Sequence, residues 1–147
     1  ESFQTFMTGE LFDLMANQSV LRYSLGGAAN EDLDVSAFDI AVQSAFADPA
    51  SVSSALFKLR AEDLLKEQTI ASARSRLSGL LIGWELAAAP DWWREMLEPP
   101  ETRIIAEDPL ATRYRRSFDL LGLKTSVRSA AAMTKAGLQA AREGIRP

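Results

Sequence analysis

Apolar residues along the first 90 positions repeat mostly at helical spacing. Leu14 and Met15 lie three and four residues after Leu11, as on one face of an α-helix. The same spacing recurs later and predicts helices that begin near residues 8, 34 and 48, with one or two more across residues 62–89. This first part of the chain is therefore predicted to be rich in helix.

Side chains suited to helix capping precede the predicted helices. Ser, Thr and Asp in such positions accept hydrogen bonds from the first backbone N–H groups of a helix. The candidate caps are Thr8, Asp34 or Ser36, Asp48, Asp108 and Ser129. Asp48 and Asp108 each precede a proline, a residue that favours the first helical position. Residues 91–97 predict one further short helix, which ends before Pro99 and Pro100.

Three segments depart from the helical pattern and predict β-strands. Residues 2–7 alternate loosely, whereas residues 102–106 and 123–127 suit short strands. The last two flank a predicted helix that ends at Gly122, and another helix follows the second of them. Strand–helix–strand–helix over about 40 residues predicts a parallel βαβ unit. We therefore expect an α/β fold in which all three strands belong to one sheet, with helices on its faces.

Composition narrows the class of protein. The chain has 147 residues, enough for one domain with a core or for one lobe of a larger protein. It is 47% hydrophobic and 24% charged, which is typical of a globular chain. A net charge of −4 argues against general nucleic-acid binding, and no run of about 18 apolar residues predicts a membrane span. The sequence starts within a predicted strand and without Met, as a piece of a longer protein would.

Cysteine and histidine are both absent, which removes several kinds of chemistry. Structural disulfides, thiolate sites, histidine general bases and histidine-ligated metals cannot come from this chain. The sequence also lacks the GxxxxGK[ST], GxGxxG and nucleophile-elbow motifs. Residue patterns alone therefore assign no catalytic group.

Two pairs of residues stand out, and each has a plain structural interpretation. Gly79 and Gly83 lie four residues apart, so they would let another backbone approach one helical face, most simply for packing. Glu85 and Asp108 could form a carboxylate pair, although solvated residues or helix caps explain them as well.

Two further clusters suit a ligand or an ordinary surface. Arg113, Arg115 and Arg116 could meet a phosphate, but such a cluster is more often a solvated face. Trp92 and Trp93 could stack on a sugar or a base, but packing over a groove explains them more simply. None of these patterns selects a function.

Three longer stretches are more specific in combination than any single motif. They are FQTFMTGELFDLMANQSVL, RLSGLLIGWELAAA and RIIAEDPLATRYRRSFDLLGL. Their order and spacing resemble those of the C-terminal lobe of the 2-dehydro-3-deoxygalactonokinase family. The resemblance covers nearly the whole chain, including the tail through Lys135-Ala136-Gly137-Leu138. It implies a helix-rich C-terminal lobe of an actin-like (ribonuclease H-like) ATPase fold, whose sheet is incomplete in this sequence.

The resemblance implies an ATP-dependent kinase that phosphorylates the 6-hydroxyl of 2-dehydro-3-deoxy-D-galactonate, a 2-keto-3-deoxy sugar acid, in galactonate degradation, with ATP and Mg²⁺ as cofactors. The missing N-terminal lobe would hold the first phosphate loop, the acidic catalytic residue and the sugar contacts. No catalytic residue is therefore expected within these 147 positions. The residues implied to lie near the nucleotide are Thr8, Gly9, Ala106, Glu107, Asp108 and Thr112. The family also implies a cytoplasmic enzyme without nucleic-acid or membrane partners, and it is compatible with a homodimer.

Two positions depart from the pattern that the family usually shows. Relatives carry a glycine in the loop where this chain has Ala106-Glu107-Asp108, and a Gly-Asp pair where it has Ala130-Ala131. If the Glu107 side chain points inward, its charge lies near an anionic nucleotide, and we expect weaker ATP binding. These departures leave open an alternative, a non-catalytic regulatory or interaction module derived from the kinase fold. A free-standing helical binding domain also fits the composition, but it does not explain the βαβ tail.

Overall fold

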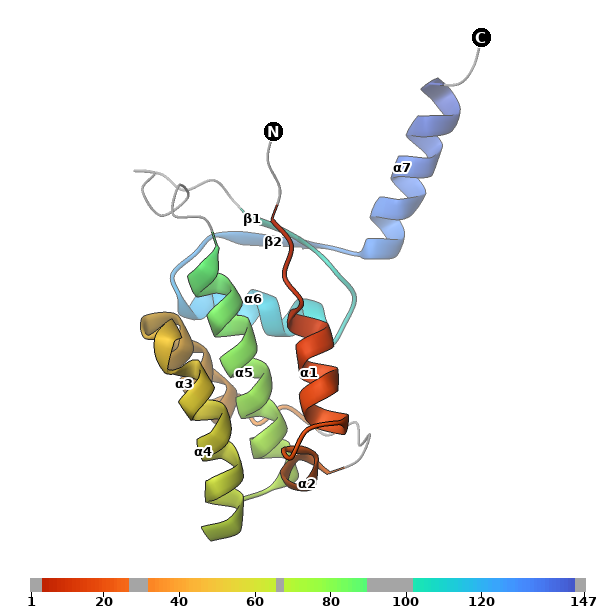
Figure 1. Cartoon of the computed structure of the whole chain (residues 1–147). Helices are drawn as coiled ribbons and strands as arrows, with labels where there is room; N and C mark the ends of the chain where they lie inside the picture. The colour runs from red at the N-terminus through yellow and green to blue at the C-terminus, as the bar shows by residue number, and fades with distance from the viewer. Residues whose placement is uncertain (1–3, 27–31, 66–67, 90–101, 145–147) are drawn as a thin grey trace. The chain divides into compact units, whose positions relative to one another are not determined.

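The computed structural model describes residues 4–26, 32–65, 68–89 and 102–144, which divide into two compact units (Figure 1). Residues 1–90 belong to a helical unit and residues 91–147 to a βαβ unit. The helical unit contains α1 (Thr8–Asn17), α2 (Arg22–Leu25), α3 (Val35–Ala47), the 3₁₀ turn η1 (Pro49–Ser51), α4 (Val52–Leu65) and α5 (Ile70–Ala88). The βαβ unit contains β1 (Thr102–Ile105), α6 (Leu110–Leu120), β2 (Thr125–Arg128) and α7 (Ala130–Gly144).

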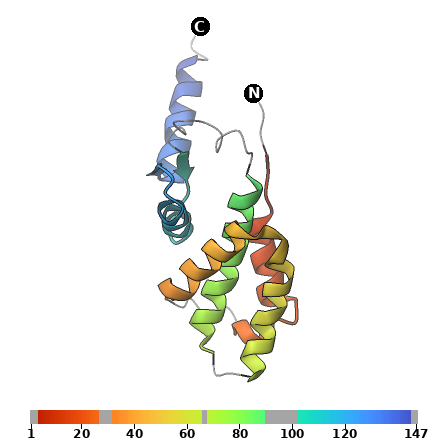
Figure 2. The same cartoon turned by 90° about the vertical axis from the view of Figure 1, so that its left-hand side faces the viewer.

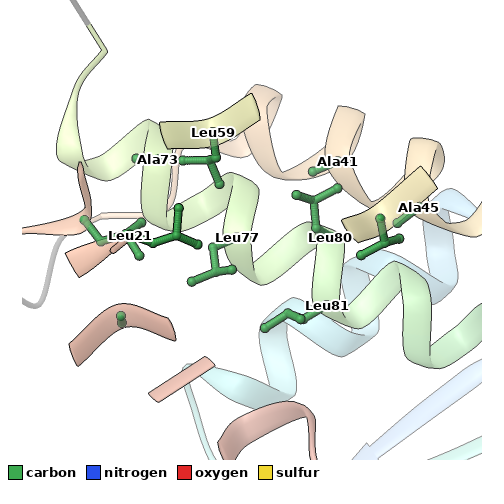
Figure 3. Packing of buried hydrophobic residues seen from close by; sticks show 11 residues of the cluster. Leu21, Ala41, Ala45, Leu59, Ala73, Leu77, Leu80 and Leu81 are labelled. Carbon is green, nitrogen blue, oxygen red and sulfur yellow. The ribbon is translucent and has the colours of Figure 1, made fainter. Parts of the chain in front are cut away.

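Helix α5 is the centre of the helical unit. Helices α1 to α4 all contact it, and two perpendicular views show them around it (Figure 1, Figure 2). Its middle, residues 77–83, is buried on every side and mostly apolar, as expected for a central helix. Leu77, Leu81 and Ile82 are each at most 2% exposed. Figure 3 shows side chains of α5 among Leu59 and the alanines of α3. Full burial of one such side chain stabilises a fold by roughly 1.5–3 kcal/mol.

Gly79 and Gly83 bring α3 and α5 into close contact. A Cβ atom added to Gly79 would lie 2.5 Å from the carbonyl oxygen of Phe38, and one added to Gly83 would lie 2.5 Å from that of Val42. Both separations are far shorter than van der Waals contact, so a side chain at either position would force the helices apart. The packing interpretation of these glycines is therefore confirmed.

The chain before α1 does not form the predicted strand. Residues 4–7 have no regular secondary structure, and residues 2–3 lie outside the described part. A strand needs neighbours for its backbone N–H and C=O groups, and the sheet formed by the described residues consists of β1 and β2. Phe6 and Met7 are exposed accordingly. Thr8 is not a cap either, because Met7 occupies the N-cap position and no side chain caps α1.

Two of the predicted caps are confirmed. The carboxylate of Asp34 accepts a hydrogen bond from the N–H of Ala37 at 3.0 Å, at the start of α3. The hydroxyl oxygen of Ser129 accepts one from the N–H of Ala132 at 3.3 Å, at the start of α7. The predicted helical range 62–89 contains two helices, since α4 ends at residue 65 and α5 begins at residue 70. The helix predicted at residues 91–97 lies outside the described residues.

Asp48 and Asp108 precede helices without capping them. Asp48 takes the N-cap position of η1, with Pro49 at the first position of that turn, but its side chain makes no capping bond. Pro109, rather than Asp108, takes the N-cap position of α6. The carboxylate of Asp108 instead accepts a hydrogen bond from the hydroxyl of Thr112 at 2.6 Å.

The βαβ unit agrees closely with its prediction. Strands β1 and β2 are parallel, with Ile105 opposite Arg128, and their bounds differ from the predicted 102–106 and 123–127 by one or two residues. Helix α6 ends as expected, because Gly122 has φ = 71° and the N–H of Leu123 donates to the carbonyl of Phe118 at 2.9 Å. The described fold is therefore a helix-rich α/β fold with a two-stranded parallel sheet.

Candidate functional site

A pocket lies at the carboxyl edge of the sheet in the βαβ unit. Its volume is about 220 Å³. Because β1 and β2 are parallel, the segments that follow them lie at the same edge, where open α/β sheets commonly bind ligands. The lining includes Ala106 and the polar or charged residues Glu107, Asp108, Thr112, Arg115 and Ser129.

Four of the six residues implied by the family resemblance meet in this pocket. Ala106, Glu107 and Asp108 follow β1 directly, and Thr112 lies in the first turn of α6. The hydrogen bond between Thr112 and Asp108 joins the loop to that turn. A strand end, a short loop and one helical turn are therefore enough to bring these four residues together.

Glu107 points toward the start of α7. Its carboxylate accepts a hydrogen bond from the hydroxyl of Ser129 at 2.7 Å and another from the backbone N–H of Ala131 at 3.0 Å. The first N–H groups of a helix have no partners within the helix and carry partial positive charge. The bond from Ala131, and then the bond from Ser129, hold the pKa of Glu107 below its ordinary value of 4.5. The carboxylate is therefore ionised at neutral pH.

The contacts of Glu107 change the expectation for nucleotide binding. Weaker ATP binding was expected for an inward carboxylate that faces the ligand. The Glu107 carboxylate lines the pocket, but it also accepts bonds from Ser129 and Ala131, whose donors offset its charge. This contact joins residues 24 positions apart, so no local pattern in the sequence signals it.

Arg115 is the cationic residue in the lining of the pocket. It shares a face of α6 with Thr112, three residues earlier. Within the described part of the chain, its guanidinium group has no hydrogen bond or ion pair. Arg113 and Arg116 are not among the lining residues, and both have interactions of their own. The arginine cluster seen in the sequence thus contributes one residue to the pocket, which the spacing from Thr112 could have identified.

Thr8 and Gly9, the other two implied residues, belong to the helical unit. The hydroxyl of Thr8 donates a hydrogen bond to the carboxylate of Glu85, which ties α1 to α5. Gly9 is exposed, and an added Cβ atom would meet nothing within 4 Å. The suggested pairing of Glu85 with Asp108 gains no support, because each carboxylate has its own hydroxyl partner.

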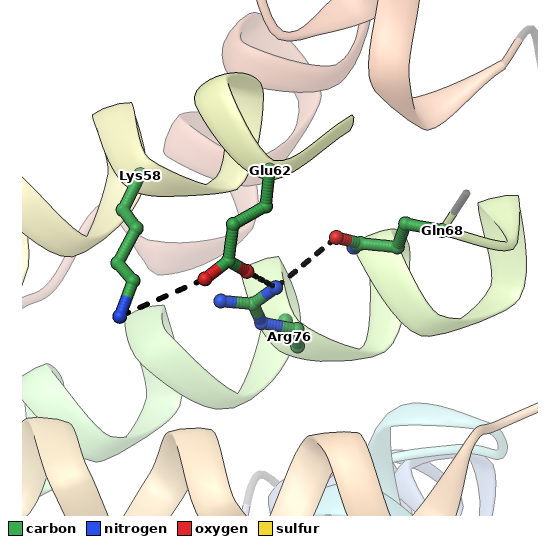
Figure 4. A network of polar contacts seen from close by, with 4 residues as sticks. All are labelled: Lys58, Glu62, Gln68 and Arg76. Carbon is green, nitrogen blue, oxygen red and sulfur yellow. Dashed lines mark hydrogen bonds and ion pairs between the residues drawn. The ribbon is translucent and has the colours of Figure 1, made fainter. Parts of the chain in front are cut away.

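A second cavity, of about 500 Å³, lies among α3, α4 and α5 of the helical unit. Two basic residues line it, and Glu62 interacts with both (Figure 4). The carboxylate of Glu62 lies 2.5 Å from Arg76 and 3.6 Å from Lys58, and Arg76 also donates to Gln68 at 3.1 Å. Glu62 offsets part of this positive charge, and Asp34 adds a carboxylate to the lining, so this cavity is a weaker candidate for an anionic ligand.

Other kinds of site find no support in the described ranges. No group of three or more potential metal-binding side chains occurs there. No helix in the same ranges has the length and apolar character needed to span a membrane. Trp92 and Trp93 lie outside the described residues, so their suggested stacking role stays a prediction.

Comparisons of the sequence point to one family. The family model for 2-keto-3-deoxy-galactonokinase matches residues 1–141. The chain is 35% identical over 147 residues to DgoK1 of Rhizobium meliloti (strain 1021), a probable 2-dehydro-3-deoxygalactonokinase, and the match covers 100% of this chain and 47% of that protein. It is 28% identical over 137 residues to the 2-dehydro-3-deoxygalactonokinase of Escherichia coli (strain K12), covering 93% of this chain and 44% of that protein.

A solved structure agrees with the sequence comparisons. It is the crystal structure of a protein from Sinorhizobium meliloti whose assigned function is 2-dehydro-3-deoxygalactonokinase. The similarity has a TM-score of 0.90 at 35% sequence identity, and it covers 100% of this chain and 48% of the solved one. The chain therefore spans about half the length of the relatives that it matches.

Proposed function

The chain belongs to the 2-keto-3-deoxy-galactonokinase family, and from this premise we propose that it is part of an ATP-dependent kinase that phosphorylates 2-dehydro-3-deoxy-D-galactonate at its 6-hydroxyl. The family match across residues 1–141 carries the proposal. The likeness of the whole chain to a solved relative, and a pocket at the carboxyl edge of a parallel sheet, support it.

We further propose that residues 1–147 supply the C-terminal, nucleotide-side lobe of a two-lobed protein with an actin-like fold. The relatives are about twice as long as this chain, which leaves room for a second lobe. That lobe would supply the catalytic carboxylate and the sugar contacts, and no catalytic residue is assigned here. Closure of two lobes over the substrates would exclude water from the reaction.

The pocket of the βαβ unit is the proposed adenosine site. Ala106 leaves space at the end of β1, and the Thr112 hydroxyl offers a polar contact. Arg115 adds a guanidinium group that can pair with an anion or stack on a planar ring. Thr8 and Gly9 are proposed as nucleotide contacts from the family resemblance, and the open space around Gly9 would permit close approach of a ligand.

Positioning is the main contribution expected from this chain. Phosphoryl transfer depends chiefly on alignment and on stabilisation of charge at the transferred group. By holding the adenosine end of ATP, the chain would keep the γ-phosphate in line with the sugar hydroxyl. A carboxylate of the other lobe would accept the proton of that hydroxyl.

Mg²⁺ is proposed to accompany ATP. In kinases the ion is usually held by substrate phosphates, waters and one or two carboxylates. The described residues contain no suitable cluster, and the pocket carboxylates of Glu107 and Asp108 already accept hydrogen bonds. These two residues therefore do not fit a preformed Mg²⁺ site, and we assign the ion to the phosphates of the nucleotide.

The main argument for a non-catalytic module is weakened by the contacts of Glu107. It rested on Glu107 and on Ala130-Ala131, where the family usually has glycine and Gly-Asp. In the structure, the Glu107 carboxylate accepts bonds from the Ser129 hydroxyl and from the backbone N–H of Ala131, and these donors offset the charge that would repel a nucleotide. We therefore favour the kinase.

A kinase assay on the full-length protein that carries this chain tests the proposal. The protein is incubated with ATP, Mg²⁺ and 2-dehydro-3-deoxygalactonate, ADP release is followed, and NMR identifies the phosphorylated carbon. We expect phosphate on the 6-hydroxyl. Protein that transfers no phosphate to this or a related 2-keto-3-deoxy sugar acid would contradict the proposal.

Substitution of Arg115 tests the position of the nucleotide. Arg115→Met should raise KM for ATP by about tenfold, as expected for loss of one charged hydrogen bond, while KM for the sugar acid changes little. Lys58→Met is the matched control, because Lys58 is a basic residue of the second cavity. An unchanged KM for ATP in Arg115→Met would place the adenosine elsewhere.

A further inference from the structure

Helix α7 has little apolar contact with the rest of the βαβ unit. None of its 15 residues is buried, and it projects from the end of β2 (Figure 2). Because α7 buries no side chain in the described structure, its orientation depends chiefly on the polar contacts at its first turn. Those contacts join Glu107, in the loop after β1, to Ser129 and Ala131.

We propose that Glu107 is a positioning residue for the nucleotide pocket, because its carboxylate fastens the first turn of α7 to the loop after β1 and so fixes one wall of the pocket. This inference rests on the proposed function, since it concerns the same pocket. In this proposal, Glu107 does not touch the nucleotide and acts only through its hydrogen bonds with Ser129 and Ala131.

The backbone of the same loop is fastened at two further points. The N–H of Ala106 donates to the carbonyl of Arg128 at 3.3 Å, which extends the β1–β2 pairing by one residue. The carbonyl of Glu107 accepts from the N–H of Ala111 at 3.1 Å, in the first turn of α6. Glu107 therefore connects to α6 through its main chain and to α7 through its side chain. Loss of the carboxylate would remove the link to α7 and leave the other two intact.

The charges around the pocket predict the direction of the effect. Asp108 is the second carboxylate in the lining, Arg115 is the cation, and the start of α7 offsets the charge of Glu107. Removing Glu107 would leave the N–H of Ala131 without this acceptor and would free the wall to move. Substitution of Glu107 by glycine should therefore weaken ATP binding, whereas charge repulsion alone predicts tighter binding.

Hydrogen exchange tests the fastening without requiring activity. Full-length protein is compared with Glu107→Gly, Glu107→Gln and Ser129→Ala, and amide exchange is measured by mass spectrometry across residues 130–133. Glu107→Gly should exchange about tenfold faster there, since one bond to a charged group is lost. Glu107→Gln should change the exchange rate less, because its side-chain amide oxygen can still accept hydrogen bonds from Ser129 and Ala131. Glu143→Gln, an exposed glutamate near the other end of α7, is the matched control and should not alter residues 130–133.

Steady-state kinetics then test the positioning role. Glu107→Gly should raise KM for ATP by roughly fivefold to tenfold, while kcat and KM for the sugar acid change by less than about twofold. Glu107→Gln should raise KM for ATP less than Glu107→Gly does. Unchanged exchange in Glu107→Gly, an unchanged KM for ATP, or a lower one would each overturn the proposal. A wild-type protein with no kinase activity would refute the proposed function instead, and the exchange data would still decide whether Glu107 fastens α7.

Discussion

The contacts within the helical unit differ in kind from the contacts within the βαβ unit. Most of the buried apolar side chains belong to the helical unit, and those of the described βαβ unit are Ile104, Ala111 and Phe118. The pocket region relies instead on single hydrogen bonds to Glu107 and Asp108. Close packing is sensitive to volume at every position, whereas a few hydrogen bonds depend on individual groups.

The candidate pocket lies in the unit that has fewer buried apolar side chains. Ligand sites commonly occur on loops at the edge of a scaffold, where polar groups are not confined within a core. Regions with few buried contacts also open locally at low free energy, and a bound ligand stabilises them by mass action. Changes of side-chain volume should therefore affect chiefly the helical unit, and changes of charge chiefly the βαβ unit.

The largest expected effect comes from a cavity in the helical unit. Leu77 is fully buried in α5, so Leu77→Ala should lower the free energy of unfolding by about 2–5 kcal/mol. Leu138 in α7 is 68% exposed, and Leu138→Ala should change stability by at most about 0.5 kcal/mol. Urea unfolding followed by circular dichroism measures both. Equal losses in the two variants would refute the contrast between the units.

A second pair of variants tests close packing by adding volume. Gly83→Leu should cost about 1–3 kcal/mol, because its side chain would meet the backbone of α3. Gly137 lies in α7 with no atom within 4 Å of an added Cβ, so Gly137→Leu should stabilise by roughly 0.5–1 kcal/mol through helix propensity. Thermal melts should show opposite shifts in Tm. Should Gly83→Leu melt with the parent protein, the close approach of α3 and α5 would be wrong.

The features predicted correctly from the sequence depend on local or periodic signals. Two glycines four residues apart inside a helical pattern indicated close packing, and the structure shows it at Gly79 and Gly83. The βαβ unit follows from three adjacent segments, and its helix ends at Gly122 because that residue adopts a positive φ. Each of these patterns lies within a short stretch of sequence, so it can be recognised without knowledge of the tertiary structure.

The features missed by the sequence depend on partners distant along the chain. Residues 4–7 have strand-like composition, but a strand forms only beside another strand, and none of the described strands pairs with them. The role of Glu107 depends on an N–H group 24 residues later. Arg115 is an exception, because its signal is local: it lies three residues after Thr112 on the same face of α6, whereas Arg113 does not line the pocket.

The smallest expected effect is a pH dependence confined to the start of α7. Hydrogen bonds from Ala131 and Ser129 hold the pKa of Glu107 below 4.5, while the nearby charge of Asp108 opposes this shift. Arg115 is the other charged side chain of the pocket lining. Because the pKa is lower in the folded state, the stabilisation is complete above pH 4.5 and is lost as the pH falls through the folded value.

Titration by NMR measures this last effect at a single amide. In protein labelled with ¹⁵N-alanine, the Ala131 N–H donates to the Glu107 carboxylate, so its proton shift should follow the ionisation of that group. The midpoint should fall below 4.5, and Glu107→Gln should abolish the transition. Ser129→Ala should move the midpoint upward by removing one of the donors to Glu107, while buried amides of α5 should not respond. A midpoint at or above 4.5, or a transition that persists in Glu107→Gln, would show that α7 is held by something other than this carboxylate, and the two units would then differ less than the contrast between packing and polar contacts requires.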